Sequence, residues 1–210
     1  AKEVIEALGL PVVQGLSEGE AQAAHIVAKK EAYAIASQDA DSLLFGATRV
    51  VRNLSIEGRR KQNGVLGYSR VEPELILLEE VLSSLGITQQ QMICLAMLVG
   101  TDYNVGGVKG IGPKTALKTV KEHKTPANIF AAVDWGKHFS YPWQEVLELF
   151  ERPKVTDDYK LEFRQINTSK LVKILCEKHD FSRQRVENQL GELEISAAAK
   201  KQKGLGDFFA

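Results

Sequence analysis

The sequence has few cysteines, no excess of charge of either sign and no long apolar run. Its two cysteines, Cys94 and Cys176, lie far apart in apolar helical patterns, and neither has a partner at the spacing of a metal site. We therefore interpret both as buried reduced thiols. No apolar run could span a bilayer, and no secretory signal is visible at the start, so we expect an intracellular protein without membrane association.

Equal numbers of basic and acidic residues, 27 of each, argue against a general polycation that coats nucleic acid. A local basic surface is still expected, because the stretch from Lys109 to Lys124 holds five lysines and a single acid, Glu122. Acids clustered in one place and lysines in another are typical of an enzyme that holds metals beside a phosphate track. With 210 residues, 44% of them hydrophobic, the chain can form one large domain or two small ones.

Patterns of helix and strand alternate as far as Asp102 and are all-helical after it, which predicts an α/β fold followed by a helical region. Early helices are predicted at 2–9, 17–30, 73–86 and 88–100. Strands are predicted at 10–13 and 32–37, and a β-ribbon at 50–56 and 64–69 with Gly58 in its turn. Later helices are predicted at 113–123, 126–132, 142–150, 168–178 and 182–193. From Ser196 the periodicity is lost, which predicts a flexible tail.

Five carboxylates occupy three sites at element boundaries of the α/β part: Glu18, Glu20, Asp39, Asp41 and Asp102. Hard cations such as Mg²⁺ or Mn²⁺ take oxygen ligands, and like charges placed close together need a cation to neutralise them. Asp39 and Asp41 follow a predicted buried strand at its carboxyl end, where open α/β sheets bind ligands, and their i, i+2 spacing places both on one side. Two metals here would activate a water and stabilise the leaving oxygen of an in-line displacement.

Each acidic site also has a purely structural interpretation. Ser17 and Glu20 match the S-x-x-E capping box, and acids in a first helical turn are favoured by the helix dipole. Gly19 between the two glutamates is a poor helix former, which a close approach by another backbone or a ligand would explain. The aspartate pair could form a surface turn, and Asp102 a turn at a helix end. Three such sites within one α/β unit favour the metal centre.

The segment from Gly107 to Lys121 predicts a hairpin and helix that bind phosphate. Its three glycines permit positive φ and a close backbone approach: Gly107, Gly110 and Gly112. Pro113 suits the first turn of a helix, on which three lysines share one face: Lys114, Lys118 and Lys121. Hairpin N–H groups and lysine ammonium groups can then meet phosphates without reading bases. A solvated lysine face would explain the lysines but not the glycines.

The chain ends in a segment with two adjacent aromatic residues, Gln202-Lys203-Gly204-Leu205-Gly206-Asp207-Phe208-Phe209. An aromatic pair after a flexible segment has no core to join, which indicates an anchor for a partner's pocket. Docking of this tail on the chain's own helical region is the alternative.

In order along the chain, these motifs resemble those of the flap endonuclease branch of the XPG-type structure-specific nucleases, most closely its archaeal members. Residues 17–24 resemble the family's glutamate motif, 38–46 its aspartate pair and 100–104 its last metal-site motif. Residues 107–118 are similar to its helix-two-turn-helix element, which binds duplex DNA, and 202–209 fit the Gln-x-x-Leu-x-x-Phe-Phe box that binds the PCNA sliding clamp. The resemblance covers essentially the whole chain.

The resemblance implies an α/β fold with part of a parallel-sheet, PIN-like nuclease core (1–104), a helical duplex-DNA-binding region (105–195) and a flexible clamp-binding tail (196–210). It implies a 5′-flap endonuclease and 5′–3′ exonuclease of DNA replication and repair, in the cytoplasm or nucleoid of an archaeon. Two Mg²⁺ or Mn²⁺ ions held by the five carboxylates would hydrolyse phosphodiester bonds in 5′-flap and nicked duplex DNA. Apart from binding the PCNA clamp, we expect a monomer.

The resemblance also implies three further sets of binding residues. Duplex DNA would be held by Arg52, Lys109, Gly110, Gly112, Lys114, Thr115, Lys118 and Lys121. A monovalent cation, commonly K⁺, would be held by hairpin carbonyls at Gly107, Val108 and Ile111. The clamp would be bound by Gln202, Leu205, Phe208 and Phe209.

One departure from the family pattern is large. Full members carry a long N-terminal part ahead of the position of Ala1, with further metal-binding aspartates, the first strands of the sheet and a basic helical arch. We therefore expect this chain to be a C-terminal portion of such an enzyme, inactive alone. Its metal centre would be incomplete, and its sheet would expose an apolar edge. One alternative is a catalytically silent DNA- and clamp-binding module. Another is a Holliday-junction or bubble nuclease of the same superfamily, although the compact spacing from Asp41 to Asp102 favours a flap enzyme.

Overall fold

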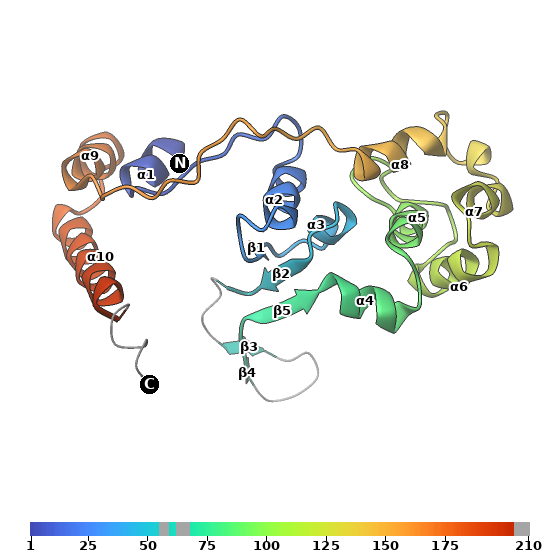
Figure 1. Cartoon of the computed structure of the whole chain (residues 1–210), viewed down its shortest axis with the longest axis horizontal. Helices are drawn as coiled ribbons and strands as arrows, with labels where there is room; N and C mark the ends of the chain where they lie inside the picture. The colour runs from blue at the N-terminus through green and yellow to red at the C-terminus, as the bar shows by residue number, and fades with distance from the viewer. Residues whose placement is uncertain (55–58, 62–67, 204–210) are drawn as a thin grey trace. The chain divides into compact units, whose positions relative to one another are not determined.

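The computed structural model describes residues 1–54, 59–61 and 68–203, with the backbone alone at 59–61, 68–70, 194 and 196–203. The chain divides into two compact units, one of residues 15–157 and one of residues 1–14 with 158–210. Figure 1 labels the elements of both units. The larger unit contains all five predicted metal ligands.

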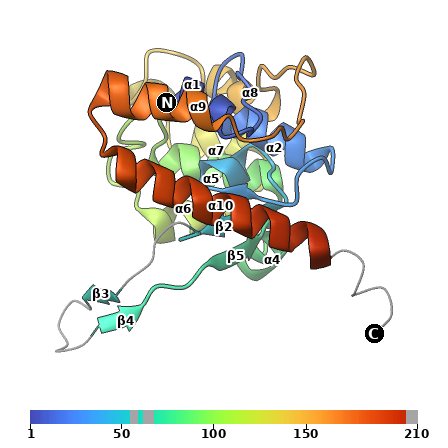
Figure 2. The same cartoon turned by 90° about the vertical axis from the view of Figure 1, so that its left-hand side faces the viewer.

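A small mixed sheet lies within the larger unit, in the strand order β1-β2-β5. The strand β1 (Ile35–Ala36) runs parallel to β2 (Arg49–Arg52), and β5 (Glu74–Leu77) runs antiparallel to β2. The helices α2 (Gly19–Ala28) and α3 (Asp41–Leu44) contact β1 and β2, respectively, and each other. A separate antiparallel ribbon, β3 (Arg59–Lys61) with β4 (Tyr68–Arg70), lies apart from this sheet (Figure 2). The predicted α/β class is confirmed, with a mixed rather than a parallel sheet because β5 returns antiparallel.

The helix α5 (Gln89–Val99) lies at the centre of the later helices of the larger unit. Five helical segments accompany it: α4 (Leu78–Leu85), α6 (Pro113–His123), α7 (Pro126–Ala132), the 3₁₀ turn η1 (Trp135–Lys137) and α8 (Trp143–Glu151). Cys94, Met97 and Leu98 of α5 are fully buried, and α5 contacts α6, α7 and α8 (Figure 1). Of the described helices, none is long and apolar enough to cross a membrane alone; α4 and α5 pass that test only as a pair bent by 76°.

One hydrophobic core serves both the sheet and these helices. It joins Val50 of β2 to Ile93 of α5, Val120 of α6 and Phe130 of α7. The contacts therefore do not break at 104/105, where the sequence predicts a domain boundary, and the compact units divide the chain elsewhere. The functional division into a nuclease core and a duplex-binding region stays a prediction.

The smaller unit brings the start of the chain beside its later helices. It contains α1 (Lys2–Ala7), α9 (Thr168–Val172), the π-helical turn η2 (Lys173–Glu177) and α10 (Arg183–Lys203). Its core consists of Ala7, Leu171, Val186 and Leu190. Gly9 has φ of +76°, its carbonyl accepts from the Arg164 N–H at 2.8 Å, and a Cβ there would lie 2.1 Å from the Arg164 carbonyl oxygen. Only glycine fits that close approach.

Several predicted helices are confirmed. Those predicted at 113–123 and 126–132 coincide with α6 and α7, each with proline at its first residue. The helix α5 begins after Thr88, which forms a capping box with Gln91, and α4 ends at Gly86 in the left-handed conformation. The helices predicted at 2–9, 17–30 and 142–150 appear as α1, α2 and α8 with slightly different ends.

The strand predictions are partly wrong. No strand forms at 10–13, where Pro11 has no N–H to donate, and the strand predicted at 32–37 is limited to β1. The helix predicted from Pro73 begins only at Leu78, because residues 74–77 pair with β2 as β5. The first strand of the predicted ribbon corresponds to β2, which pairs with β1 and β5 in the sheet. The observed ribbon is formed by β3 and β4. Gly58 lies outside the described residues.

The C-terminal predictions also need correction. The helix predicted at 168–178 is α9 followed by the π-helical turn η2. The helix predicted at 182–193 is α10, which continues to Lys203 although the sequence predicts a flexible tail from Ser196. The run of alanine and lysine from Ala197 has high helix propensity, which outweighs its lack of apolar periodicity. Residues 204–210 lie outside the described residues.

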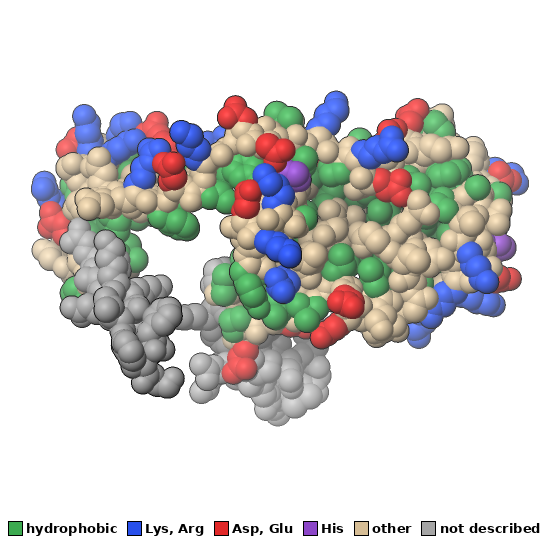
Figure 3. All heavy atoms as spheres, in the orientation of Figure 1, with side chains coloured by type: hydrophobic (Ala, Val, Ile, Leu, Met, Phe, Trp, Pro, Cys, Tyr) green, Lys and Arg blue, Asp and Glu red, His purple; other side chains and the backbone are tan. Residues whose placement is uncertain are grey.

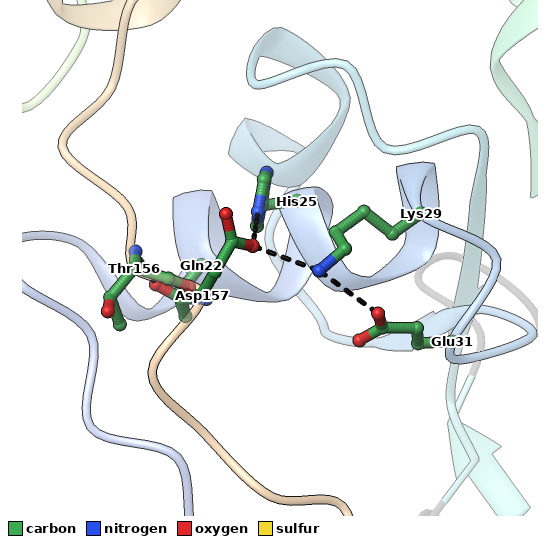
Figure 4. Close-up of polar contacts among 6 residues, drawn as sticks. All are labelled: Gln22, His25, Lys29, Glu31, Thr156 and Asp157. Atoms are coloured by element: carbon green, nitrogen blue, oxygen red, sulfur yellow. Dashed lines mark hydrogen bonds and ion pairs between the residues drawn. The ribbon is translucent and has the colours of Figure 1, made fainter.

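A polar contact fixes the chain after α8 to α2. Gln22 is 2% exposed, and its side-chain amide donates to the Thr156 carbonyl and accepts from the Thr156 N–H, both at 2.8 Å (Figure 4). Beside it, His25 and Lys29 both contact the Asp157 carboxylate, at 2.8 and 2.9 Å. The amide thus pairs with both backbone groups of Thr156 and connects that segment to α2, the helix that carries Glu20.

Replacing Gln22 by alanine should therefore destabilise the chain by about 2 kcal/mol, because it removes both hydrogen bonds to Thr156. Gln90→Ala is the matched control, because Gln90 is exposed and makes one hydrogen bond to Glu151. The control should change the free energy of unfolding by less than about 0.5 kcal/mol. Chemical unfolding of the two variants measures the difference, and equal stability would show that the Gln22 contact contributes little.

Candidate metal and nucleic-acid site

The five predicted carboxylates line one cavity of about 190 Å³. Glu18 and Glu20 stand at the start of α2, Asp39 lies in the loop after β1, and Asp41 begins α3. Asp102 lies in the turn after α5. Three segments that are far apart in the sequence thus bring their acids together, with Phe45, Tyr103 and Phe150 completing the wall. The structure confirms that the five side chains share one cavity; their role as ligands stays a prediction.

The acids in this cavity lie close enough to affect one another's protonation. The pKa of the Asp41 carboxyl is raised, first by partial burial and then by the negative charges of its four neighbours in the cavity. In order of effect, these neighbours are Glu20, Asp102, Asp39 and Glu18. Burial, with Glu18 as the next cause, raises the pKa of the Tyr103 hydroxyl to about 12. The Tyr103 hydroxyl therefore keeps its proton at neutral pH and can donate it to a hydrogen bond.

The structural alternatives for the acids are supported in part: Glu20 lies in the first turn of α2 and Asp102 in the turn after α5, but the capping box is not formed. Glu18, not Ser17, is the N-cap of α2, and α2 has no side-chain cap, so no capping box forms there. Asp39 and Asp41 do not share a face of a strand, because β1 already ends at Ala36; the turn into α3 brings them together instead. The proposed close approach at Gly19 is also absent among the described residues, since a Cβ there would meet nothing within 4 Å.

Asn104 holds the turn that carries Asp102. This residue is 1% exposed; its amide donates to the Met97 carbonyl at 2.6 Å, and its oxygen accepts from the Thr101 hydroxyl at 2.6 Å. Gly107, with φ of +59°, lies so close to α5 that a Cβ would come within 2.3 Å of the Val99 carbonyl group. Asn104 belongs to the motif at 100–104, but its position directly after Asp102-Tyr103 does not reveal its structural role.

Two hydroxyl groups inside the site have no signal in the sequence. Ser37 donates to a Glu20 oxygen at 2.7 Å, and Tyr103 donates to a Glu18 oxygen at 3.2 Å. Both residues lie beside predicted acids in the chain, but nothing in their spacing reveals these contacts. They connect both glutamates to segments that carry the aspartates.

The donor set suits a divalent cation chemically. Five carboxylates around one small cavity supply the oxygen ligands that Mg²⁺ and Mn²⁺ require, and a cation would relieve the repulsion at Asp41. Among the described residues, however, no three His, Cys, Asp or Glu side chains converge closely enough to form a metal site as they stand. A larger groove of about 1260 Å³ along α4 has Arg49, Glu79 and Glu80 as its charged groups and offers no comparable cluster.

A hairpin and a lysine-bearing helix follow directly from the acidic turn. Gly107 and Gly110 have positive φ as predicted, whereas Gly112 has φ of −93° and caps α6, so a positive φ at Gly112 is not observed. Ala116 and Val120 of α6 are buried, and its lysines are exposed: Lys114, Lys118 and Lys121. Lys and Arg side chains gather at the edge of the molecule that carries α6 (Figure 3).

The remaining predicted binding residues fall into three groups. Arg52, Lys109 and Thr115 are exposed, at the end of β2, in the hairpin and in α6, respectively. In the hairpin, the Val108 carbonyl accepts from the Ile111 N–H at 3.0 Å. Of the clamp-binding residues, Leu205, Phe208 and Phe209 lie outside the described residues, and only the backbone of Gln202 is described.

Comparisons with known proteins match this chain over most of its length. The family model "XPG I-region" matches residues 9–102. Flap endonuclease 1 of Thermococcus onnurineus is 50% identical over 209 residues, which cover 100% of this chain and 60% of that relative. The chain thus spans about 60% of the length of that curated relative.

Solved structures show the same fold. The flap endonuclease-1 of Methanococcus jannaschii matches with a TM-score of 0.78 and 37% identity, over 95% of this chain and 57% of that one. Human GEN1 in complex with Holliday junction DNA matches with a TM-score of 0.68 over 90% of this chain and 49% of that one; its 23% identity supports the fold alone. Given the identity over the whole chain, the matched family model and the shared fold, this chain belongs to the flap endonuclease family of the XPG-type structure-specific nucleases.

Proposed function

We propose that this chain forms part of a structure-specific 5′-flap endonuclease, with 5′–3′ exonuclease activity, that acts in DNA replication and repair. The observation that carries the proposal is the single cavity lined by five carboxylates, directly followed in the chain by a glycine hairpin and an exposed lysine face. An acidic cavity alone would suit many metal enzymes. Together with the hairpin and lysine face, which we call the phosphate grip, it suits hydrolysis of a nucleic-acid backbone.

The five carboxylates would hold two Mg²⁺ or Mn²⁺ ions, directly or through water. When bound, such ions supply a hydroxide nucleophile and stabilise the departing oxygen. Asp39, Asp41 and Asp102 come from loops and helix ends, so their side chains can adjust toward a cation, while α2 gives the two glutamates a fixed frame. Phe45 and Phe150 add apolar walls to this cavity.

The hairpin and α6 would hold duplex DNA by its phosphates. Backbone N–H groups at Gly110 and Gly112 and the ammonium groups of Lys114 and Lys118 contact charge, not base edges, so the selectivity is for structure rather than sequence. A K⁺ ion bound by carbonyls at Gly107, Val108 and Ile111 would bridge the hairpin to a phosphate. Arg52 and Lys109 would contact the same duplex.

At the C-terminus, the Gln-x-x-Leu-x-x-Phe-Phe box would dock on the PCNA sliding clamp. The two adjacent aromatic residues, Phe208 and Phe209, would fill an apolar pocket of the clamp, and tethering would raise the local concentration of the nuclease at replication sites.

The rival function is a DNA- and clamp-binding module that cuts nothing. The motivating observation is that no three described acidic side chains lie close enough together to hold a metal ion, in a chain that spans about 60% of its relative. The two functions differ in one property, since both predict salt-sensitive binding of duplex DNA but only one predicts cleavage. A junction nuclease remains a third candidate, because GEN1 in its Holliday junction complex has the same fold.

Cleavage of a labelled 5′-flap duplex in Mg²⁺ tests the proposal most simply. We expect this chain alone to bind the flap without cutting it. We expect a chimera, completed with the part of the Thermococcus onnurineus relative that this chain does not span, to cut near the junction. Chelation or Asp39→Ala should abolish cleavage by the chimera and leave binding intact. Cleavage that survives Asp39→Ala would remove the aspartate pair from the active site, and preferred cleavage of a four-way junction would favour the junction nuclease.

Asp41→Asn tests the repulsion inside the cavity. In EDTA at neutral pH the variant should melt a few degrees higher than the parent chain, because it removes a carboxylate that its neighbours oppose; solvent screening keeps the gain small. In Mg²⁺ the order should reverse, since the parent chain gains more from the ion. Thermal unfolding with and without the metal measures both changes. An Asp41→Asn variant that is less stable in EDTA would contradict the account.

The double variant Lys114→Ala with Lys118→Ala tests the phosphate grip. Loss of two phosphate contacts should weaken duplex binding equally for unrelated sequences and lower the slope of log affinity against log salt by about 2. Lys137→Ala is the control, because the Lys137 ammonium already pairs with Asp134. A salt slope unchanged by the double variant would show that α6 does not touch the DNA backbone.

A further inference from the structure

Each glutamate of the acidic cavity accepts a hydrogen bond from a neutral hydroxyl. The Ser37 hydroxyl donates to Glu20 Oε1 at 2.7 Å, and the Tyr103 hydroxyl donates to Glu18 Oε1 at 3.2 Å. In both cases the donor comes from a different segment than α2, which carries the glutamates. The two contacts therefore connect α2 to the loop after β1 and to the turn after α5.

Ser37 is firmly placed to act as such a donor. Its backbone N–H donates to the Val51 carbonyl of β2 at 3.2 Å, which continues the pairing of β1 with β2 by one residue. Its hydroxyl oxygen also accepts from the Asp39 N–H at 3.1 Å. The half-buried hydroxyl of Ser37 thus orients the Glu20 carboxylate and fixes the backbone at Asp39. It connects the start of α2 and the loop before α3 to the end of β1.

Tyr103 is held from two sides. Its ring packs edge-on against Phe150, with ring centroids 5.2 Å apart, and its carbonyl accepts from the Tyr141 hydroxyl at 3.2 Å. The residue directly follows Asp102 and lines the cavity itself. Its hydroxyl can therefore orient Glu18 from a ring whose position depends on packing, not on the hydrogen bond.

Neutral donors have a chemical advantage at this place. A lysine or arginine beside Glu18 or Glu20 would orient the carboxylate too, but its positive charge would compete with a divalent cation. The described residues that line the cavity include neither lysine nor arginine. A hydroxyl fixes one carboxylate oxygen and leaves both the negative charge and the second oxygen free for the ion, as partners of metal ligands commonly do.

We propose that Ser37 and Tyr103 are positioning residues of the metal centre, which orient Glu20 and Glu18 through their hydroxyls. The proposal rests on the proposed function only in that the five carboxylates bind divalent cations. It adds two residues that contact no metal themselves and yet set how tightly the site binds one.

The test measures Mn²⁺ binding to this chain by isothermal titration, with the melting temperature in EDTA as a second readout. Ser37→Ala and Tyr103→Phe should each weaken Mn²⁺ binding by about tenfold, the lower end of the effect typical for partners of metal ligands. Tyr103→Phe keeps the ring contact with Phe150, so its melting temperature in EDTA should stay near that of the parent chain.

Two control variants separate positioning from structure. Tyr141→Phe removes a hydrogen bond to the Tyr103 carbonyl without touching Glu18, and Ser37→Thr keeps the hydroxyl. Both should bind Mn²⁺ within about twofold of the parent chain, whereas Asp41→Asn should lose most binding. Equal affinity of Ser37→Ala, Tyr103→Phe and the parent would overturn the positioning role and leave the metal site standing. An equal loss in Tyr141→Phe and Tyr103→Phe would also overturn it. A parent chain that binds no Mn²⁺ would overturn the metal site and, with it, the positioning role.

Discussion

The repulsion among five carboxylates in one cavity of about 190 Å³ is the constraint on which the rest of the structure depends. Burial, followed by the charges of its four acidic neighbours, raises the pKa of the Asp41 carboxyl, so the ionised cluster opposes folding. The apolar core around α5 and the contacts that fix α2 must therefore hold the acids in place against their own repulsion. A divalent cation would replace the repulsion among the carboxylates by their attraction to the cation, which favours binding of such an ion here.

The path of the chain connects the acidic cavity to the phosphate grip. Asp102 follows α5, the buried Asn104 fixes the turn, and Gly107 packs against the end of α5 before the hairpin leads into α6. Since α5 and α6 share one core, the lysines of α6 stand at a set separation from the carboxylates. Such a fixed separation would let a duplex held by its backbone present one phosphodiester bond to the cavity.

Much of this arrangement could be predicted from the sequence, because its signals are local. The boundaries of α6 and α7 follow from Pro113 and Pro126, and the start of α5 follows from the capping residues Thr88 and Gln91. The five carboxylates stood out by their pairing and their place at element ends. These features depend on a few neighbouring residues, so tertiary structure has little chance to override them.

What the sequence could not reveal depends on contacts between distant segments. Residues 74–77 fit a helical period as well as a strand, and only pairing with β2 decides between the two. The amide of Gln22 meets Thr156 across 134 positions of the chain, and the Tyr103 hydroxyl meets Glu18 across 85. No periodicity or motif in the sequence encodes such distant pairs. Gly112 shows a different limit, because glycine permits positive φ but does not require it.

The most direct test of the central claim is a crystal structure of this chain grown in Mn²⁺, examined by anomalous scattering. The account predicts anomalous peaks inside the cavity, with oxygens of Asp39, Asp41 and Asp102 drawn in to ligand distance and Ser37 and Tyr103 still bonded to the two glutamates. Full Mn²⁺ occupancy elsewhere, with the cavity free of metal and the five carboxylates apart, would contradict the claim that these acids form a metal centre.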